Sequence, residues 1–182
     1  MSGTANVNWA ITDDPLQQTR QLAALCNISN AGELSSTALA TALRQIDAVI
    51  LFNAADGLKY WHVDPLTNFR PVVENASVPN AFLTAHPIEV LETGKCQAVP
   101  WLLGHVPNEG AVRVTQIYEN TTLRSSFNAR FDELIRLVND MPKVFSLAQM
   151  LEKTSAIIQE YFGKQHELNN ETIQGFMDVS RI

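Results

Sequence analysis

Apolar side chains recur along much of the chain every three to four residues, which is the spacing of one helix face. Aspartate, serine or proline precedes several of these stripes and favours the start of a helix, while glycine or proline favours the end of others. The pattern predicts about six or seven helices. Their approximate extents are residues 14–27, 35–50, 86–94, 109–117, 127–141, 147–163 and 170–182.

One apolar run lacks the helical spacing. Val99-Pro-Trp-Leu-Leu-Gly104 is compact, uncharged and ends in glycine, which is typical of a buried strand. Pro100 stands near its start, where a strand tolerates proline. A parallel strand needs neighbours on both sides, and this chain offers few candidates to supply them. Residues 53–79 contain Gly, Pro and Asn at intervals, which favour turns, and they are predicted to be a loop with short extended pieces.

Composition and charge narrow the possible classes of protein. The chain has 182 residues, of which 46% are hydrophobic and 18% charged, so disorder is excluded and a large buried fraction is favoured. The net charge of -6 argues against nucleic acid or an anionic membrane as the main partner. No apolar stretch approaches the ~20 residues of a transmembrane helix, so no membrane span is expected. The N-terminal residues lack the basic and apolar regions of a signal peptide.

Glycine and cysteine positions exclude several kinds of site. The eight glycines never recur at the spacing of a G-x-S-x-G nucleophile elbow, a G-x-G-x-x-G dinucleotide loop or a phosphate-binding loop. There is no H-E-x-x-H motif either. Cys26 and Cys96 belong to no C-x-x-C pair, so neither a metal site nor a cofactor is expected. The two cysteines could form one disulfide or remain free thiols.

Four N-x-[ST] sequons are present, which is a mild excess over chance. They admit two interpretations, namely coincidence or a glycosylated protein of the secretory pathway. The candidate glycosylation sites are Asn27, Asn75, Asn120 and Asn170.

Several short motifs follow one another along nearly the whole chain. They are Ser2-Gly3-Thr4-Ala5 with Trp9-Ala10, Leu22-Ala23-Ala24-Leu25-Cys26, Ala42-Leu43-Arg44, Phe69-Arg70-Pro71-Val72-Val73-Glu74, Pro87 with Gly94-Lys95, Val99-Pro100 with Gly104 and Asn108-Glu109-Gly110, and, more loosely, Phe176-Met177-Asp178. In this order and at these spacings, the motifs resemble those of the type-B carboxylesterases, the family of insect esterases, juvenile hormone esterases and cholinesterases.

The resemblance implies an α/β class and a fragment of the α/β-hydrolase fold, mainly helical with few parallel strands. Residues 1–182 are then expected to be a partial carboxylesterase domain. It would begin just past the nucleophile elbow and end before the catalytic histidine region. In many relatives the cysteine that matches Cys26 pairs with one near position 42, where this chain has alanine. Cys26 is therefore expected to be free, or paired with Cys96 or with something else.

Glu109 is the residue to which the resemblance assigns chemistry, as the acid of a Ser-His-Glu triad. Such a carboxylate accepts the imidazole N–H, fixes the histidine tautomer and stabilises the imidazolium. Without the resemblance, Glu109 would be an ordinary acid in the first turn of a helix. His62, His86, His105 and His166 match no catalytic histidine of the family.

The function expected is that of part of a serine carboxylic-ester hydrolase with an acyl-enzyme mechanism, acting on small-molecule esters. The isolated chain is expected to be inactive, since it has only the acid of the triad. The complete protein is expected to be secreted or to reside in the secretory pathway. The alternative is a cholinesterase-like adhesion or binding module that has lost its triad. Retention of Glu109 leans against that alternative.

Overall fold

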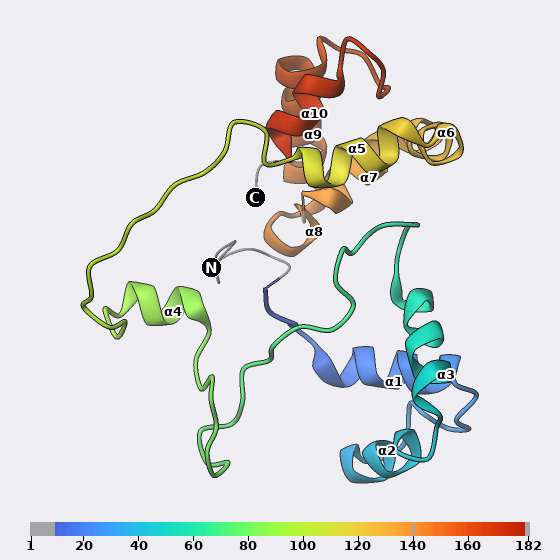
Figure 1. Ribbon diagram of the computed structural model, residues 1–182, viewed down its shortest axis with the longest axis vertical. Helices are drawn as coiled ribbons and strands as arrows, with labels where there is room; N and C mark the ends of the chain where they lie inside the picture. Colours follow the sequence, from blue (N-terminus) through green and yellow to red (C-terminus); the bar gives the residue numbers. More distant parts are fainter. Residues whose placement is uncertain (1–9, 140, 181–182) are drawn as a thin grey trace. The chain divides into compact units, whose positions relative to one another are not determined.

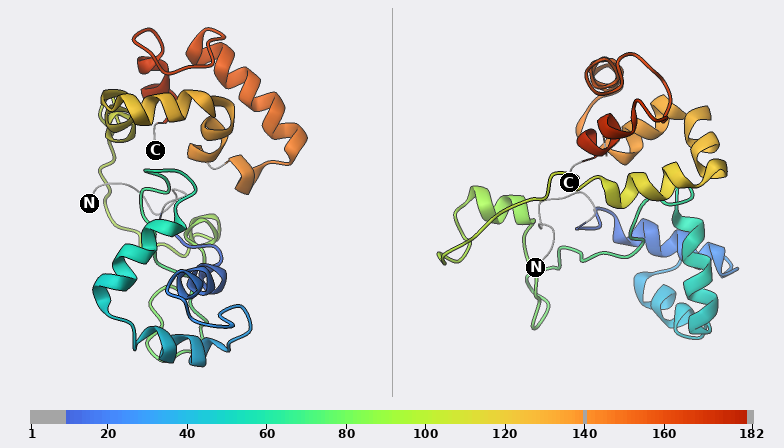
Figure 2. Two further views of the ribbon diagram at one scale, coloured as in Figure 1. Left: turned by 90° about the vertical axis from the view of Figure 1, so that its right-hand side faces the viewer. Right: turned by 45° about the horizontal axis from the view of Figure 1, so that its top comes forward.

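The computed structural model describes residues 10–139 and 141–180, which form helices and connecting loops (Figure 1, Figure 2). The chain divides into two compact units, Met1–Ala98 and Val99–Ile182, and each is described by itself. The mainly helical character is as predicted. None of the described residues belongs to a strand, and a bridge between Trp61 and Asp64 is the pairing found among them. The motif of Ser2–Ala5 with Trp9 lies outside the described residues.

In the first unit, helix starts follow the predicted capping residues. Helix α1 (Pro15–Leu25) begins after Asp14, whose carboxylate accepts the Gln17 N–H at 2.9 Å. Helix α2 (Ser36–Leu43) begins after Ser35. Between the two helices lies a small core of alanine and leucine. Its buried members are Ala23, Ala31 and Leu39.

The single helix predicted over residues 35–50 is wrong, because two helices cover that region. Helix α2 ends at Leu43, and α3 (Ala48–Ala54) continues into the 3-10 turn η1 (Ala55–Leu58). The physical cause is a second cap. The Asp47 carboxylate accepts the Val49 N–H at 2.8 Å and starts a new helix there. The predicted apolar stripe divides with it, since Leu39 is buried while Ile50 is exposed.

The remainder of the first unit is irregular apart from one short helix. Helix α4 (Pro87–Glu92) begins at proline, with His86 Nδ1 accepting the Ile88 N–H at 3.3 Å, and it ends before Gly94. This helix was predicted from the same residues. The loop predicted over residues 53–79 is confirmed from Lys59 onward.

The second unit is a helical bundle around a phenylalanine core. Phe127, Phe131, Phe162 and Phe176 are buried, and the Phe127 and Phe176 rings lie against each other, tilted by 36°, with centroids 4.9 Å apart. Tyr161, next to Phe162 in the chain, is exposed. The helices are α5 (Ala111–Glu119), α6 (Thr121–Ala129), α7 (Phe131–Val138), α8 (Met141–Val144), α9 (Leu147–Phe162) and α10 (Ile173–Val179).

The apolar stripe from Phe127 to Val138 is buried, but it lies on two helices rather than on the single helix predicted over residues 127–141. The chain leaves the helical conformation at Arg130, between α6 and α7. The Arg130 guanidinium donates to both carboxylate oxygens of Glu133, at 2.9 and 2.6 Å, across the first turn of α7. Helix α9 shows the predicted extent. A capping box of Ser146 and Gln149 starts it, and Gly163 ends it in the left-handed conformation.

Candidate functional site

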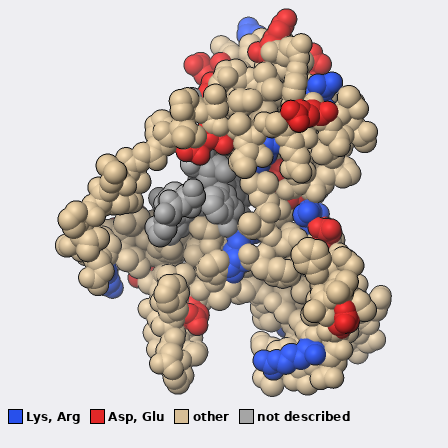
Figure 3. Space-filling view, viewed as in Figure 1, with Lys and Arg blue, Asp and Glu red and all other residues tan. Residues whose placement is uncertain are grey.

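The segment that leads to Glu109 is extended, but it is not the buried strand predicted for residues 99–104. Trp101, Leu102 and Leu103 are 75%, 98% and 72% exposed. Among the described residues, no backbone hydrogen bond involves residues 99–105. A strand requires a neighbour to receive those bonds, and none of the described segments supplies one. Figure 3 shows this stretch as a surface without charged side chains, in line with the sequence from Cys96 to Asn108.

Glu109 lies in the turn that ends this segment, two residues before α5 begins. Its Oε1 accepts the backbone N–H of Val106 at 3.0 Å, so the carboxylate closes its own turn. The side chain is half-buried. Its place just before the helix puts the carboxylate at the positive end of the α5 dipole. Its Oε2 makes no hydrogen bond with a described residue, which leaves one oxygen available to a further donor.

The residues on both sides of Glu109 are fixed to α10. Asn108 Oδ1 accepts from Gln174 Nε2 at 3.1 Å, and that amide also donates to Asp178 at 3.2 Å. Gly110 is buried, and a Cβ there would overlap the backbone carbonyl of Met177. The motif Asn108-Glu109-Gly110 can therefore sit this close to α10 only because it has glycine. The resemblance of residues 176–178 is loose, yet α10 is the element that supports the motif.

Within the described part of the second unit, no histidine bonds to Glu109. The exposed His105, although close in sequence, directs Nδ1 toward the Val106 carbonyl at 3.3 Å. His86 caps α4, and the rings of His62 and Trp61 meet edge to face. His166 forms a pair with Asp132, its Nδ1 2.6 Å from Oδ1. Sequence reasoning missed this pair because its members are 34 positions apart and follow no motif.

All four candidate glycosylation asparagines are exposed. Asn27 has a positive φ of 60° after the end of α1. The Asn75 side chain accepts from both the N–H and the hydroxyl of Ser77, each at 2.9 Å. Asn120 caps α6 by accepting the N–H groups of Thr122 and Leu123. Asn170 Oδ1 accepts from the Tyr118 hydroxyl.

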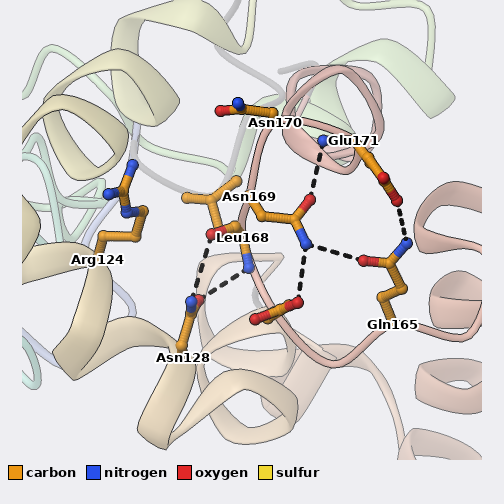
Figure 4. Close-up of a pocket in the computed structure, with 8 residues that line it drawn as sticks. Arg124, Asn128, Gln165, Leu168, Asn169, Asn170 and Glu171 are labelled. Atoms are coloured by element: carbon orange, nitrogen blue, oxygen red, sulfur yellow. Dashed lines mark hydrogen bonds between the residues drawn. The ribbon is translucent and has the colours of Figure 1, made fainter.

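A polar hollow of about 540 Å³ opens beside Asn170 in the second unit (Figure 4). Seven of its eight lining residues are polar or charged. The loop at its centre is held by Asn128, whose side chain bonds both the N–H and the carbonyl of Leu168. The lining residues are Arg124, Asn128, Gln165, Glu167, Leu168, Asn169, Asn170 and Glu171. The sequence analysis did not predict this hollow, because Asn128 and Leu168 are 40 positions apart and belong to no common motif.

Cysteine, metal and membrane findings concern the described part of the chain. Cys26 and Cys96 are both free thiols, which decides the alternatives left open above. No group of three or more His, Cys, Asp or Glu side chains is placed to hold a metal ion in residues 10–139 and 141–180. No single helix there is long and apolar enough to cross a membrane. The bent pair Ser36–Leu43 and Ala48–Leu58 meets the length and composition of a crossing only when taken together.

Comparison with known proteins gives a consistent result. The sequence matches the carboxylesterase family over residues 1–180. It is 35% identical to the juvenile hormone esterase of Tribolium castaneum over 138 residues, which is 74% of this chain and 23% of the relative. It is 25% identical to venom carboxylesterase-6 of Apis mellifera over 181 residues (98% and 31%), and 25% identical to esterase S of Drosophila virilis over 186 residues (100% and 33%).

These relatives are much longer than the part that is matched. The chain spans about a third of their length or less. The match nevertheless covers almost every residue of this chain, and it includes the turn that holds Glu109. The chain belongs to the carboxylesterase family.

Proposed function

We propose that the chain forms part of a serine carboxylic-ester hydrolase in which Glu109 is the acid of a Ser-His-Glu triad. The observation that carries the proposal is the state of the Glu109 carboxylate. One oxygen is bound to the Val106 N–H at 3.0 Å, and the other has no partner among the described residues. A triad acid requires this combination, because it must be fixed in place and still accept one imidazole N–H.

The support around Glu109 suits a positioning task. Gln174 binds Asn108 on one side, and the backbone of Met177 lies against Gly110 on the other. The carboxylate therefore rests on a helix rather than on a freely moving loop. A histidine oriented by it would take the serine proton, and the acyl-enzyme formed would then be hydrolysed by water.

The exposed apolar segment before Glu109 supports the same proposal. A central strand of an α/β-hydrolase sheet, seen without its neighbours, would be apolar on both faces and would lack ladder hydrogen bonds. Residues 99–104 have both properties. We propose that residues 1–182 are a partial domain, and that the nucleophile elbow, the histidine and the neighbouring strands lie in the two thirds of an esterase that this chain does not match.

The family and the names of its members support a chemical class of substrate. A family of ester hydrolases with one relative named for juvenile hormone and another for venom supports a small-molecule carboxylic ester as substrate. The four exposed sequons support a glycoprotein of the secretory pathway. The net charge of -6 leans against nucleic acid as a partner.

A chimera tests the catalytic role of Glu109. Residues 1–180 replace the matching segment of the Apis mellifera carboxylesterase, and hydrolysis of a naphthyl ester is followed. We expect Glu109→Gln to lower kcat by about 10⁴-fold, the loss seen when a triad acid is replaced by its neutral amide. The matched control is Glu119→Gln at the exposed end of α5, which should leave kcat unchanged. Equal kcat in the two variants would refute the assignment of Glu109.

The 182-residue chain by itself supplies a second test. It contains the proposed acid but no nucleophile elbow, so we expect no ester turnover above that of its own Glu109→Gln variant. Turnover that disappears in the variant would show that this chain holds a complete site.

A further inference from the structure

The hollow beside Asn170 has the chemistry of a site for a neutral, hydroxyl-rich ligand. Two carboxylates, Glu167 and Glu171, and one guanidinium, Arg124, line it. The excess of carboxylates disfavours an anion, and the guanidinium weakens the attraction for a cation. Sugar hydroxyls both donate and accept, so they can use both kinds of group at once.

The lining is already organised. The Asn169 amide donates to Gln165 and Glu167, both at 2.8 Å, and Gln165 donates to Glu171 at 2.9 Å (Figure 4). These bonds use one oxygen of each carboxylate and leave the second one without a described partner. Arg124 uses Nη1 on the Tyr118 carbonyl, at 3.1 Å. A ligand would therefore meet free donors and acceptors on a wall that need not rearrange.

Asn170 lies at this wall with its side chain in a defined orientation. The Tyr118 hydroxyl donates to its Oδ1, and Arg124 lies over the Tyr118 ring, 4.9 Å from the centroid. Asn170 Nδ2 makes no hydrogen bond with a described residue. Nδ2 is the atom that takes a sugar in an N-x-[ST] sequon, and this one is Asn170-Glu171-Thr172.

We propose that Asn170 carries an N-linked glycan whose first N-acetylglucosamine lies in the hollow lined by Arg124, Glu167 and Glu171. The donor class is a lipid-linked oligosaccharide diphosphate. A bond forms between Nδ2 and the anomeric carbon of the sugar, the amide loses a proton, and the diphosphate leaves. The inference rests on the secretory route given under the proposed function.

The burial of Thr172 indicates the order in which glycosylation and folding take place. Its side chain is 2% exposed, and its hydroxyl donates to the Glu167 carbonyl at 2.7 Å. The sequon hydroxyl is thus accessible only before α10 packs, so the sugar is added to the unfolded chain. The hollow then receives the sugar as the helices assemble.

Asn75 provides the internal comparison. Its sequon lies in an exposed loop of the first unit, closed by local bonds to Ser77, and it contributes nothing to the hollow. A glycan there projects into solvent. The two sites of one chain should therefore both be modified but should protect their glycans to different degrees.

The experiment uses the 182-residue chain behind a secretion signal in insect cells, so entry into the pathway is imposed and does not depend on the natural route. Glycan occupancy is measured by mass spectrometry on total cell extract. Release by peptide-N-glycosidase is then timed on the native chain. We expect both sites to be occupied and release at Asn170 to be about tenfold slower than at Asn75, since two net hydrogen bonds suffice for that factor. After denaturation the two rates should be equal.

Variants separate binding in the hollow from simple crowding. Arg124→Ala should bring the native release rate at Asn170 up to that at Asn75, while Arg44→Ala, an exposed arginine of the first unit, should not. Glu167→Gln, which retains an acceptor for Asn169, is the second variant should Arg124→Ala fail to fold, and it should also speed release. An empty Asn170, equal native rates, or no response to these variants would overturn the proposal. The chimera assay of Glu109 is independent of each of these outcomes.

Discussion

Two stretches of the second unit carry large apolar side chains, but one is buried and the other is exposed. The stripe from Phe127 to Val138 is buried, and its rings contact α9 and α10 at centroid distances such as 5.1 Å between Phe131 and Phe162. Residues 99–106 extend into solvent, and Leu102 is 98% exposed. The stripe finds partners a few tens of residues further along the same chain. The extended segment finds none among the described residues.

The difference shows that an apolar pattern indicates which residues tend to be buried, but not which other segment will cover them. A helix satisfies its own backbone hydrogen bonds, so it needs only a second apolar surface. A strand also needs another backbone beside it. The segment before Glu109 has the composition of a strand, and in this chain it lacks both requirements. The predictions below test that contrast.

Truncation of the phenylalanine core should have the largest effect on stability. We expect Phe176→Ala to lower the free energy of unfolding by about 3–5 kcal/mol, because the ring is fully buried against Phe127 and Phe162. Urea unfolding of the dilute chain, followed by circular dichroism, measures the loss. Leu102→Ala is the matched control and should change the free energy by less than about 0.5 kcal/mol. A loss at Leu102 comparable to that at Phe176 would mean that the segment is packed.

In the chimera, Leu102→Ala tests whether residues 99–104 become buried. If the rest of an esterase buries residues 99–104, Leu102→Ala there should cost about 2–5 kcal/mol, the range for a buried leucine. The same substitution would thus be neutral in the 182-residue chain and severe in the longer one. An unchanged unfolding midpoint in both proteins would remove the support for a central strand.

Close approach of α10 to the Glu109 turn should give the next largest effect. We expect Gly110→Ala to destabilise the chain by about 1–3 kcal/mol, since the added methyl group would overlap the Met177 backbone. In the chimera the same substitution should also lower kcat by displacing the carboxylate. Gly32→Ala serves as the control, because a Cβ at Gly32 meets nothing within 4 Å. Equal stability of the two alanine variants would contradict the packing described here.

Exposure of the apolar segment predicts self-association of the isolated chain, because an extended and uncharged edge pairs with other chains. Leu102→Lys should raise the soluble fraction at micromolar concentration, measured by light scattering. Val112→Lys adds the same charge at a similarly exposed position, 68% against 98%, but on helix α5. It should help less, since α5 offers no unpaired backbone. Equal solubility of both variants would assign the effect to net charge alone.

How much of this structure the sequence predicts depends on the range of the interactions involved. Caps and helix ends are local, so the starts at Asp14, Ser35 and Ser146 and the end at Gly163 follow from neighbouring residues. The break at Asp47 was missed because the apolar spacing continues through it while a single carboxylate restarts the helix.

The same distinction between local and distant interactions applies to the candidate site. Glu109 was found through a motif within one short stretch, and whether it meets a histidine stays a prediction. The support of its turn by α10 joins positions 66 apart, as in the bond from Gln174 to Asn108, and no local pattern predicts it. The strand predicted over residues 99–104 is wrong for this chain, because its apolar composition indicates burial while no described segment pairs with its backbone.

The smallest effect concerns the break between α6 and α7, where the Arg130 guanidinium lowers the pKa of the Glu133 carboxyl by hydrogen bonding. Because the pKa of this carboxyl is lower in the folded chain, the unfolded chain binds the proton more readily. The pair therefore stabilises the folded chain at pH values above the ordinary pKa of 4.5. This contribution is lost as the pH falls below that value. Both side chains are exposed, so the contribution is small and screened by salt. Glu133→Gln should therefore lower the unfolding midpoint slightly at pH 7, and by less as the pH falls toward 3. Glu152→Gln on α9 should show no such dependence. An effect of Glu133→Gln that grows toward acid pH would mean that the break is held by something other than this pair.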